Sequence, residues 1–204
     1  VYMGIITIPY YAGIPSAENP IAPLNTFWKA APGAYVPPFD QSLPDKTSTN
    51  VTVANPFPVL TDMQTVPVLM SVPNAASGHE KPAAGWPVVL FAHGLRGSRV
   101  QMLPMADAAA AAGYAVIKID APLHGIRPED ETFAALYIGN TPFADVANER
   151  TFDADYIDNA TGAPGPDGIT DPSGIHIINL ASLVTTRDNW RQAQADWSIL
   201  DVSV

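Results

Sequence analysis

The residues of this chain that could do chemistry lie directly after two apolar segments. His93, Gly94 and Leu95 follow the first of them, residues 86–92. A glycine-containing turn at the end of a strand leaves a backbone N–H free to point at a ligand instead of joining a sheet. An amide in that place can stabilise the oxyanion of a tetrahedral intermediate. We therefore predict that the N–H of Leu95, carried by Gly94, is one donor of an oxyanion hole.

Three histidine and aspartate side chains near this turn are interpreted as structural supports of the site. A histidine ring has a donor and an acceptor, so His93 is expected to hold the loop by bonding nearby backbone, and not to carry a proton. Asp120 and His124 follow the second apolar segment, residues 114–119, and could be mistaken for two members of a catalytic triad. We expect them, together with Gly125, to pin the turn after that segment.

A nucleophile is not assigned within the chain. No Gly-x-Ser-x-Gly pentapeptide occurs, and Ser98 and Ser203 lack the flanking glycines of a nucleophile elbow. The chain has no cysteine, which excludes disulfides, a thiolate nucleophile and thiolate metal sites. No catalytic acid or base is assigned either.

An acidic, glycine-rich stretch extends from residue 153 to residue 174. Asp153, Asp155 and Asp158 could offer oxygen ligands to calcium, but their spacing does not match an EF-hand loop. A solvated acidic loop bordering the active site is the favoured interpretation. We therefore predict no cofactor and no metal, with calcium as the alternative.

Charge and composition exclude several classes of partner. The chain has 10 Lys and Arg against 20 Asp and Glu, a formal net charge of -10, and its basic residues are scattered. No basic face is expected, so no nucleic acid partner is predicted. No segment reaches the roughly 18 apolar residues of a membrane span. The lysine-poor, Pro-, Thr- and Asn-rich composition favours an extracytoplasmic protein.

The elements that position the candidate residues are expected to alternate between strand and helix. Strands are predicted at 66–72, 86–92 and 114–119. The uninterrupted apolar run 86–92 is typical of a strand buried on both faces. Between the last two strands, a helix is predicted at 103–112, ending at Gly113.

A final helix is expected over residues 185–200. Thr185 and Asp188 have the spacing of a capping box. Residues at 3,4,3 spacing form a core-facing stripe consisting of Trp190, Ala193, Trp197 and Leu200. Arg187, Asp188 and Arg191 are placed on the opposite side or at the helix start, where ion pairing is their ordinary role.

The first part of the chain has a different composition, because prolines recur throughout residues 1–62, Pro44 among them. Long regular elements cannot form there, so we expect short strands such as residues 4–8 linked by extended loops packed on the core. The predicted domains are 1–62 and 63–204, with a cap-like insertion at about 127–180 in the second.

Several segments resemble a known fold. Three that occur in the order of an α/β-hydrolase are Phe91 to Leu95, Gly113 to Val116 and Asp120 to Gly125. A closer resemblance is to the extracellular lipases of Gram-negative bacteria grouped as virulence-factor lipases. It also rests on Ile8 to Tyr11, Pro23 to Trp28, Asp167 to Gly174 and Ile178 to Asn189.

The resemblance implies an α/β protein, the N-terminal half of an α/β-hydrolase sheet with crossover helices after a Pro-rich region. It implies a secreted or surface-exposed carboxylic ester hydrolase that acts on acyl-ester lipids at a lipid interface, through a Ser, Asp and His triad. In family order the nucleophile follows the final helix, so we expect it beyond Val204. The fragment alone is then expected to be inactive and to self-associate or pair with its C-terminal half.

Two alternatives stay open from the sequence. The same fold could act on another acyl substrate, such as a peptide, a polyester or a lactone, because an oxyanion loop suits acyl transfer in general. The chain could also be a non-catalytic binding module derived from the fold.

Overall fold

A computed structural model describes residues 1–43 and 46–204, and Pro44 of the Pro-rich region lies outside them. The chain divides into two compact units. The first consists of residues 1–8, 64–175 and 193–204, and the second of residues 9–63 and 176–192. The predicted domain boundary at residue 62 stays a prediction. In this structure, residues 1–8 belong to the first unit.

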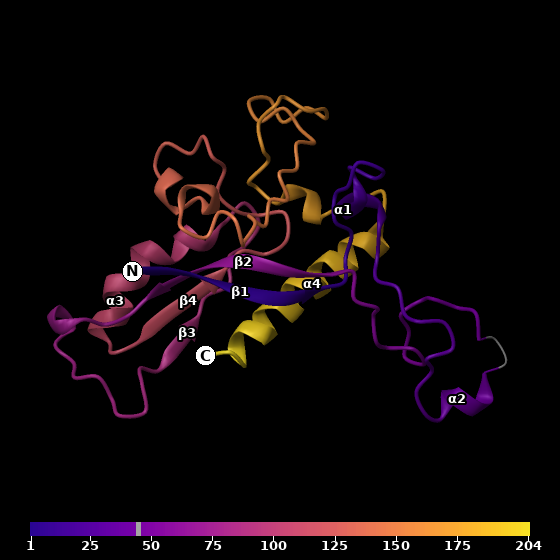
Figure 1. Ribbon diagram of the computed structural model, residues 1–204, viewed down its shortest axis with the longest axis horizontal. Coiled ribbons are helices and arrows are strands. Elements are labelled where there is room, and N and C mark those ends of the chain that lie inside the picture. Colours follow the sequence, from indigo (N-terminus) through magenta and orange to yellow (C-terminus); the bar gives the residue numbers. More distant parts are fainter. Residues whose placement is uncertain (44–45) are drawn as a thin grey trace. The chain divides into compact units, whose positions relative to one another are not determined.

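A mixed four-stranded sheet forms the centre of the first unit (Figure 1), with the order β1-β2-β4-β3. Its strands are β1 (Tyr2–Tyr10), β2 (Asp62–Ser71), β3 (Val88–Leu90) and β4 (Ala115–Ile119). β2 runs antiparallel to β4, with Val68 opposite Ile119. β3 runs parallel to β4, with Val88 opposite Ala115. The chain is therefore a mixed α/β protein, as the sequence predicts at this level.

The connection from β3 to β4 contains the predicted helix. A 3-10 turn at Arg99–Met102 leads into α3, which spans Leu103–Ala111. Pro104 lies in the first turn of α3, where its missing N–H breaks no helical hydrogen bond. Gly113, with φ of 82°, lies just past the helix end, in the left-handed conformation that glycine adopts at no steric cost.

The prediction that residues 86–92 form a strand buried on both faces is wrong. β3 covers only Val88–Leu90, and Val88 is 38% exposed. The reason is its place in the sheet: β3 is the last strand of the described order, so only β4 flanks it. A continuous apolar run does not distinguish such an edge strand from a central one.

Two hydrophobic clusters lie on either side of β4, because successive strand residues face opposite sides of a sheet. Val116 packs with residues of one cluster, which also contains Leu69, Val100, Met102 and Ile126. Ile117 and Ile119 belong to the other, which also contains Val68 and Leu200. Apolar residues of the predicted cap-like insertion, Phe133, Leu136 and Tyr137, pack against the first cluster.

Short elements complete the described residues. The first unit contains 3-10 helices η1 (Ala75–Ser77), η3 (Ala134–Leu136) and η4 (Ile138–Asn140). A further one, η5, spans Ile175–Ile177. The second unit contains α1 (Ala22–Asn25) and α2 (Phe39–Ser42), so its Pro-rich part is mostly irregular, as proline predicts.

The final helix, α4, spans Leu183–Asp201 and starts before the predicted residue 185. The predicted capping box of Thr185 and Asp188 is wrong, because Thr185 already lies inside the helix. Ser182 caps it instead: the Thr185 N–H donates to its hydroxyl at 3.4 Å and the Thr186 N–H to its carbonyl at 3.0 Å.

The buried face of α4 is more polar than predicted. Ala193 and Leu200 are buried, as expected, and so are the polar residues Asn189, Gln192 and Asp196. Asp188 is fully buried, so of its two predicted places, the opposite side or the helix start, only the helix start fits. Its expected ion pairing is confirmed: Arg187 and Arg191 contact its Oδ1 at 2.8 and 3.1 Å.

The polar face of α4 binds the backbone of the Pro-rich loops within the second unit. The Gln192 amide accepts from the Tyr11 N–H at 2.8 Å and donates to the Pro9 carbonyl at 3.0 Å. Asp188 accepts from the Trp28 N–H at 3.1 Å. Irregular backbone cannot pair its own polar groups, so side chains supply the partners.

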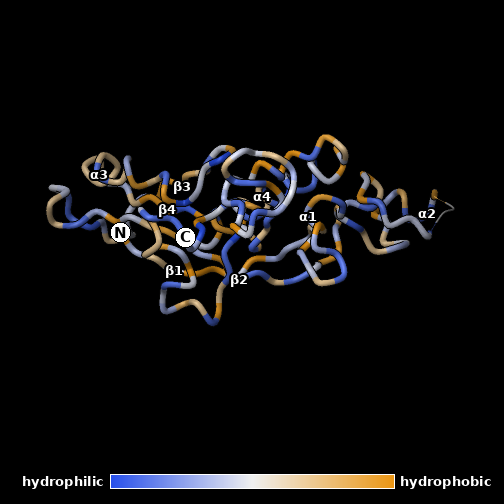
Figure 2. Tube along the Cα trace, turned by 90° about the horizontal axis from the view of Figure 1, so that it is seen from above, coloured by the Kyte–Doolittle hydropathy of each residue, from blue (hydrophilic) through white to orange (hydrophobic). Residues whose placement is uncertain are grey.

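Among the described helices, none has the length and the hydropathy that crossing a membrane would take. Hydrophobic and hydrophilic stretches are interleaved along the chain (Figure 2).

Candidate functional site

The parallel pairing of β3 and β4 brings the predicted site residues together. The carboxyl ends of parallel strands meet at the same edge of a sheet, where open α/β sheets place their sites. His93 follows β3 and Asp120 follows β4, and His93 Nε2 lies 3.8 Å from Asp120 Oδ1. Both side chains are buried. The first unit therefore contains a buried cluster of polar side chains at this sheet edge.

His93 bonds backbone at both ring nitrogens. Its Nδ1 lies 2.9 Å from the Gly94 carbonyl, and its Nε2 accepts from the Ala121 N–H at 2.9 Å. Because Nε2 is an acceptor, the ring proton belongs on Nδ1. Burial lowers the pKa of His93, against the opposing effect of Asp120. These are the contacts predicted for a loop support, while the functional role of His93 stays a prediction.

The backbone N–H of Leu95 donates to no residue in the described part of the chain. The turn around it is fixed by its neighbours: Gly97 N–H donates to the Gly94 carbonyl at 3.0 Å and Arg96 N–H to the Ser173 carbonyl at 2.9 Å. Arg96 has φ of 63°, a conformation that costs energy for a residue with a side chain. These contacts therefore fix the turn after β3 and leave the Leu95 N–H without a hydrogen-bond partner among the described residues.

Arg99 joins three parts of the first unit, and no motif in the sequence singles it out. Its buried guanidinium contacts the Asp120 carboxylate, which also accepts from the Arg99 backbone N–H. It also donates to both oxygens of Glu149, at 2.8 and 2.6 Å, and to the Leu136 carbonyl at 2.6 Å. Burial opposes its charge, but the two carboxylates outweigh burial and raise the pKa of Arg99.

His124 and Gly125 hold the turn after β4. The His124 ring lies 4.6 Å from the His93 ring, and its Nδ1 is 2.9 Å from the Pro122 carbonyl. Burial is the main cause that lowers the pKa of His124 to about 4, so the ring is neutral near pH 7. Gly125 N–H donates to the Pro172 carbonyl at 3.3 Å. Both residues therefore contact backbone at this turn, and their role as supports of a functional site stays a prediction.

Gly174 packs closely against the His124 ring in this turn. A Cβ at this position would lie 2.0 Å from Cε1 of His124, and the φ of Gly174 is +60°. Both the space and the backbone conformation therefore require glycine. The sequence predicts only a glycine-rich loop here, and no local pattern indicates the contact of Gly174 with the histidine.

Lys118 is a buried cation that the sequence analysis did not single out. It lies on β4 and is 0% exposed. Its Nζ is 4.2 Å from the centroid of the Phe91 ring and has no hydrogen-bond partner among the described residues. Burial lowers the pKa of Lys118 to about 8, although Asp120 opposes the shift. The signal for it in the sequence was a lysine inside an apolar strand.

Carboxylates of the stretch 153–174 accept hydrogen bonds from backbone N–H groups. Asp155 accepts from the N–H groups of Asp167 and Gly168, at 3.0 and 2.8 Å. Asp158 accepts from Ala160 and Thr161 at 2.9 and 2.8 Å. Within the described residues, no three His, Asp or Glu side chains are placed to hold a metal ion. The structure therefore does not bring Asp153, Asp155 and Asp158 together as one ligand set.

The described site offers an amide donor but no activated hydroxyl. Neither His93 nor His124 hydrogen-bonds a hydroxyl group in the described residues. The arrangement can stabilise negative charge at the end of β3, and it lacks a nucleophile with its base.

No protein-family model, no curated protein and no solved structure matches the chain.

Proposed function

We propose that this chain is part of a carboxylic ester hydrolase of the lipase or esterase type with an α/β-hydrolase fold. The single observation that carries the proposal is the Leu95 N–H, which follows the third strand and has no partner among the described residues. In that fold, one oxyanion donor comes from the loop after the third strand. The turn after the fourth strand, from Asp120 to Gly125, supports that loop through His93.

The Leu95 amide would act on the charge that develops during acyl transfer. When a serine hydroxyl attacks the ester carbonyl, the carbonyl oxygen becomes an oxyanion. One fixed amide donor contributes on the order of 3 kcal/mol to its stabilisation, because it needs no reorientation. The second donor follows the nucleophile, which we place with the acid and the base beyond Val204. We propose an acyl-ester lipid as substrate and a secreted or surface location.

Substitutions of Leu95 test the backbone amide, because the proposed role belongs to its N–H and not to its side chain. In the product of the complete open reading frame, Leu95→Pro removes the N–H, whereas Leu95→Ala keeps it. We expect Leu95→Pro to lower kcat on p-nitrophenyl esters by about 10²- to 10³-fold, with a nearly unchanged KM. Leu95→Ala is the matched control and should retain kcat. A Leu95→Pro variant that melts like the wild type and keeps its kcat would contradict the proposal.

Two further measurements separate this proposal from its alternatives. A panel of p-nitrophenyl esters against peptide anilides distinguishes an esterase from an enzyme for another acyl substrate, and a chain-length preference marks a lipase. The isolated 204-residue chain is expected to show no turnover, since it supplies one oxyanion donor and no triad. Turnover by that chain would overturn the assignment of roles.

A further inference from the structure

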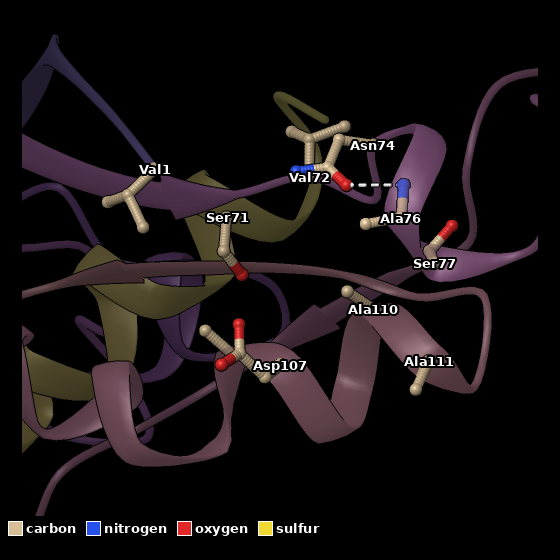
Figure 3. Close-up of a pocket in the computed structure, with 10 residues that line it drawn as sticks. Val1, Ser71, Val72, Asn74, Ala76, Ser77, Asp107, Ala110 and Ala111 are labelled. Atoms are coloured by element: carbon tan, nitrogen blue, oxygen red, sulfur yellow. Dashed lines mark hydrogen bonds between the residues drawn. The ribbon is translucent and has the colours of Figure 1, made fainter.

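A cavity of the second unit combines apolar side chains with a guanidinium. In the first unit, the cavity between the end of β2 and α3 is lined mainly by alanine, valine and serine (Figure 3). The cavity of the second unit has a volume of about 280 Å³ and is lined by Phe27, Trp28, Asn50, Val51, Val184 and Arg187. All of these residues lie within 9–63 and 176–192, so one compact unit builds the whole wall.

Arg187 keeps one edge of its guanidinium unused. Its Nε and Nη2 donate to the two carboxylate oxygens of Asp188, at 2.8 and 2.9 Å. Its Nη1 forms no hydrogen bond with a described residue, and the side chain is 44% exposed. A guanidinium is a planar fork that can bind a carboxylate with two parallel N–H groups. The N–H groups left on Nη1 and Nη2 can therefore bind a second carboxylate.

The charge beside the cavity is positive. Asp188 is buried and is also contacted by Arg191, at 3.1 Å, so two cations share one carboxylate. Lys29 adds a third cation: it pairs with Asn50 in an antiparallel bridge, and its Nζ lies 3.7 Å from the centroid of the Phe27 ring. Among the described residues, no acidic side chain lines the cavity. These charges favour a negatively charged ligand.

The acidic excess of the chain belongs to the first unit. Residues 9–63 and 176–192 contain four basic and five acidic residues, whereas the rest of the chain contains six and 15. Salt screens solvent-exposed charges over about 8 Å at physiological ionic strength. The charges beside the cavity, and not the formal net charge of -10, therefore decide which ligand it takes.

We propose that this cavity binds a small aromatic carboxylate. The carboxylate accepts two hydrogen bonds from the unused edge of Arg187. The side-chain amide of Asn50, which has no partner among the described residues, supplies a further donor. Phe27 and Trp28 contact the ring of the ligand, because aromatic side chains pair favourably with other rings. This site does not depend on the ester hydrolase proposal.

Titration with sodium benzoate tests the site on the 204-residue chain itself, through the backbone amide resonances of Val51 and Val184. At about pH 7 a carboxyl group is ionised. We expect saturable shifts with a Kd of about 1 mM. Arg187→Gln should weaken binding by about tenfold or more, because the charge and the paired donors are lost. Arg191→Gln is the matched control: it removes the other ion pair of Asp188 without changing the cavity wall, so its Kd should stay within about threefold of the wild type.

Val184→Asp tests the charge of the wall while Arg187 is kept. Val184 is exposed in the first turn of α4, where a carboxylate suits the helix, so the fold should be retained. The new carboxylate lies three residues before Arg187, so it competes for the guanidinium and repels benzoate. Binding should fall by about tenfold or more, and circular dichroism verifies that each variant is folded.

Benzamide isolates the role of the ligand charge, because it has the same ring and is neutral. It should bind at least about tenfold more weakly than benzoate. The proposal is overturned by benzoate shifts that do not saturate or by equal binding of benzamide. It is also overturned if folded Arg187→Gln or Val184→Asp binds benzoate as tightly as the wild type, or if Arg191→Gln weakens binding as much as Arg187→Gln.

Discussion

Replacement of Lys118 by methionine is expected to stabilise the first unit near pH 7. The Lys118 ammonium is buried over the Phe91 ring and forms no hydrogen bond with a described residue. Methionine is unbranched and of similar length, so it can fill the same space without a charge. The substitution therefore removes a buried cation and keeps the packing of β4.

The size of the effect follows from the pKa of Lys118, which falls from 10.5 to about 8. Burial lowers it, and the attraction of Asp120 offsets part of the shift. At about 1.4 kcal/mol per pKa unit, the charged form costs roughly 3 kcal/mol more in the folded state than in the unfolded one. Allowing for relaxation around the site, we expect Lys118→Met to raise the free energy of unfolding by about 1 to 3 kcal/mol.

The prediction also fixes the direction in which the free energy of unfolding changes with pH. Because the pKa of Lys118 is lower in the folded state than in the unfolded state, the unfolded chain binds more protons than the folded chain between pH 8 and pH 10.5. The free energy of unfolding of the wild type should therefore rise with pH across that window. Lys118→Met lacks the titrating group, so its advantage over the wild type should shrink across the same window.

Urea unfolding followed by tryptophan fluorescence, at about pH 7 and about pH 10, measures both effects. Lys81→Met is the matched control: Lys81 is exposed, and its replacement should change stability by less than about 0.5 kcal/mol. If Lys118→Met were less stable than the wild type at pH 7, the ammonium would be a required counter-charge for Asp120. An equal difference at both pH values would also refute the reasoning.

Three further predictions concern other contacts of the first unit. Gly174→Ala should lower the free energy of unfolding by about 2 kcal/mol or more in urea titrations, because its Cβ would overlap the His124 ring; wild-type stability would show that the turn can move. Asp196→Ala removes the carboxylate that the buried Arg150 contacts, so a loss of about 3 to 5 kcal/mol is expected, and a loss below about 1 would contradict this. The backbone N–H bonds of Asp158 lower its pKa below the ordinary 3.8, so their contribution is present above that pH and is lost as the pH falls through the lowered value. Amide resonances of the loop should shift there, and unchanged ones would refute it.

The sequence predicted the elements that rest on local signals. The helix α3 was expected because its alanines favour helix, Pro104 suits the first turn and Gly113 suits the end. All three are neighbours in the chain, so no tertiary information was needed. The strand β4 and the loop at His93 were found in the same way. These elements place His93 and Asp120 at one sheet edge once β3 and β4 pair in parallel.

Long-range polar contacts could not be predicted in this way. Arg99 and Glu149 are far apart in sequence, and no spacing rule joins a guanidinium to a carboxylate at that separation. The buried polar face of α4 was missed for a related reason. An apolar stripe was expected to face a core, whereas Gln192 faces irregular backbone that needs hydrogen-bond partners. Periodicity shows which side is apolar but not what the other residues meet.

The contacts of Arg99 constrain how this protein can change over evolutionary time. Loss of either carboxylate, at Asp120 or at Glu149, would leave a buried guanidinium partly uncompensated, which is more harmful than replacing the whole group with apolar residues. Single substitutions at these three positions should therefore be rare among natural variants, and joint substitutions should be the tolerated route. We therefore expect these three residues to be substituted together during evolution, although they lie in separate segments of the sequence.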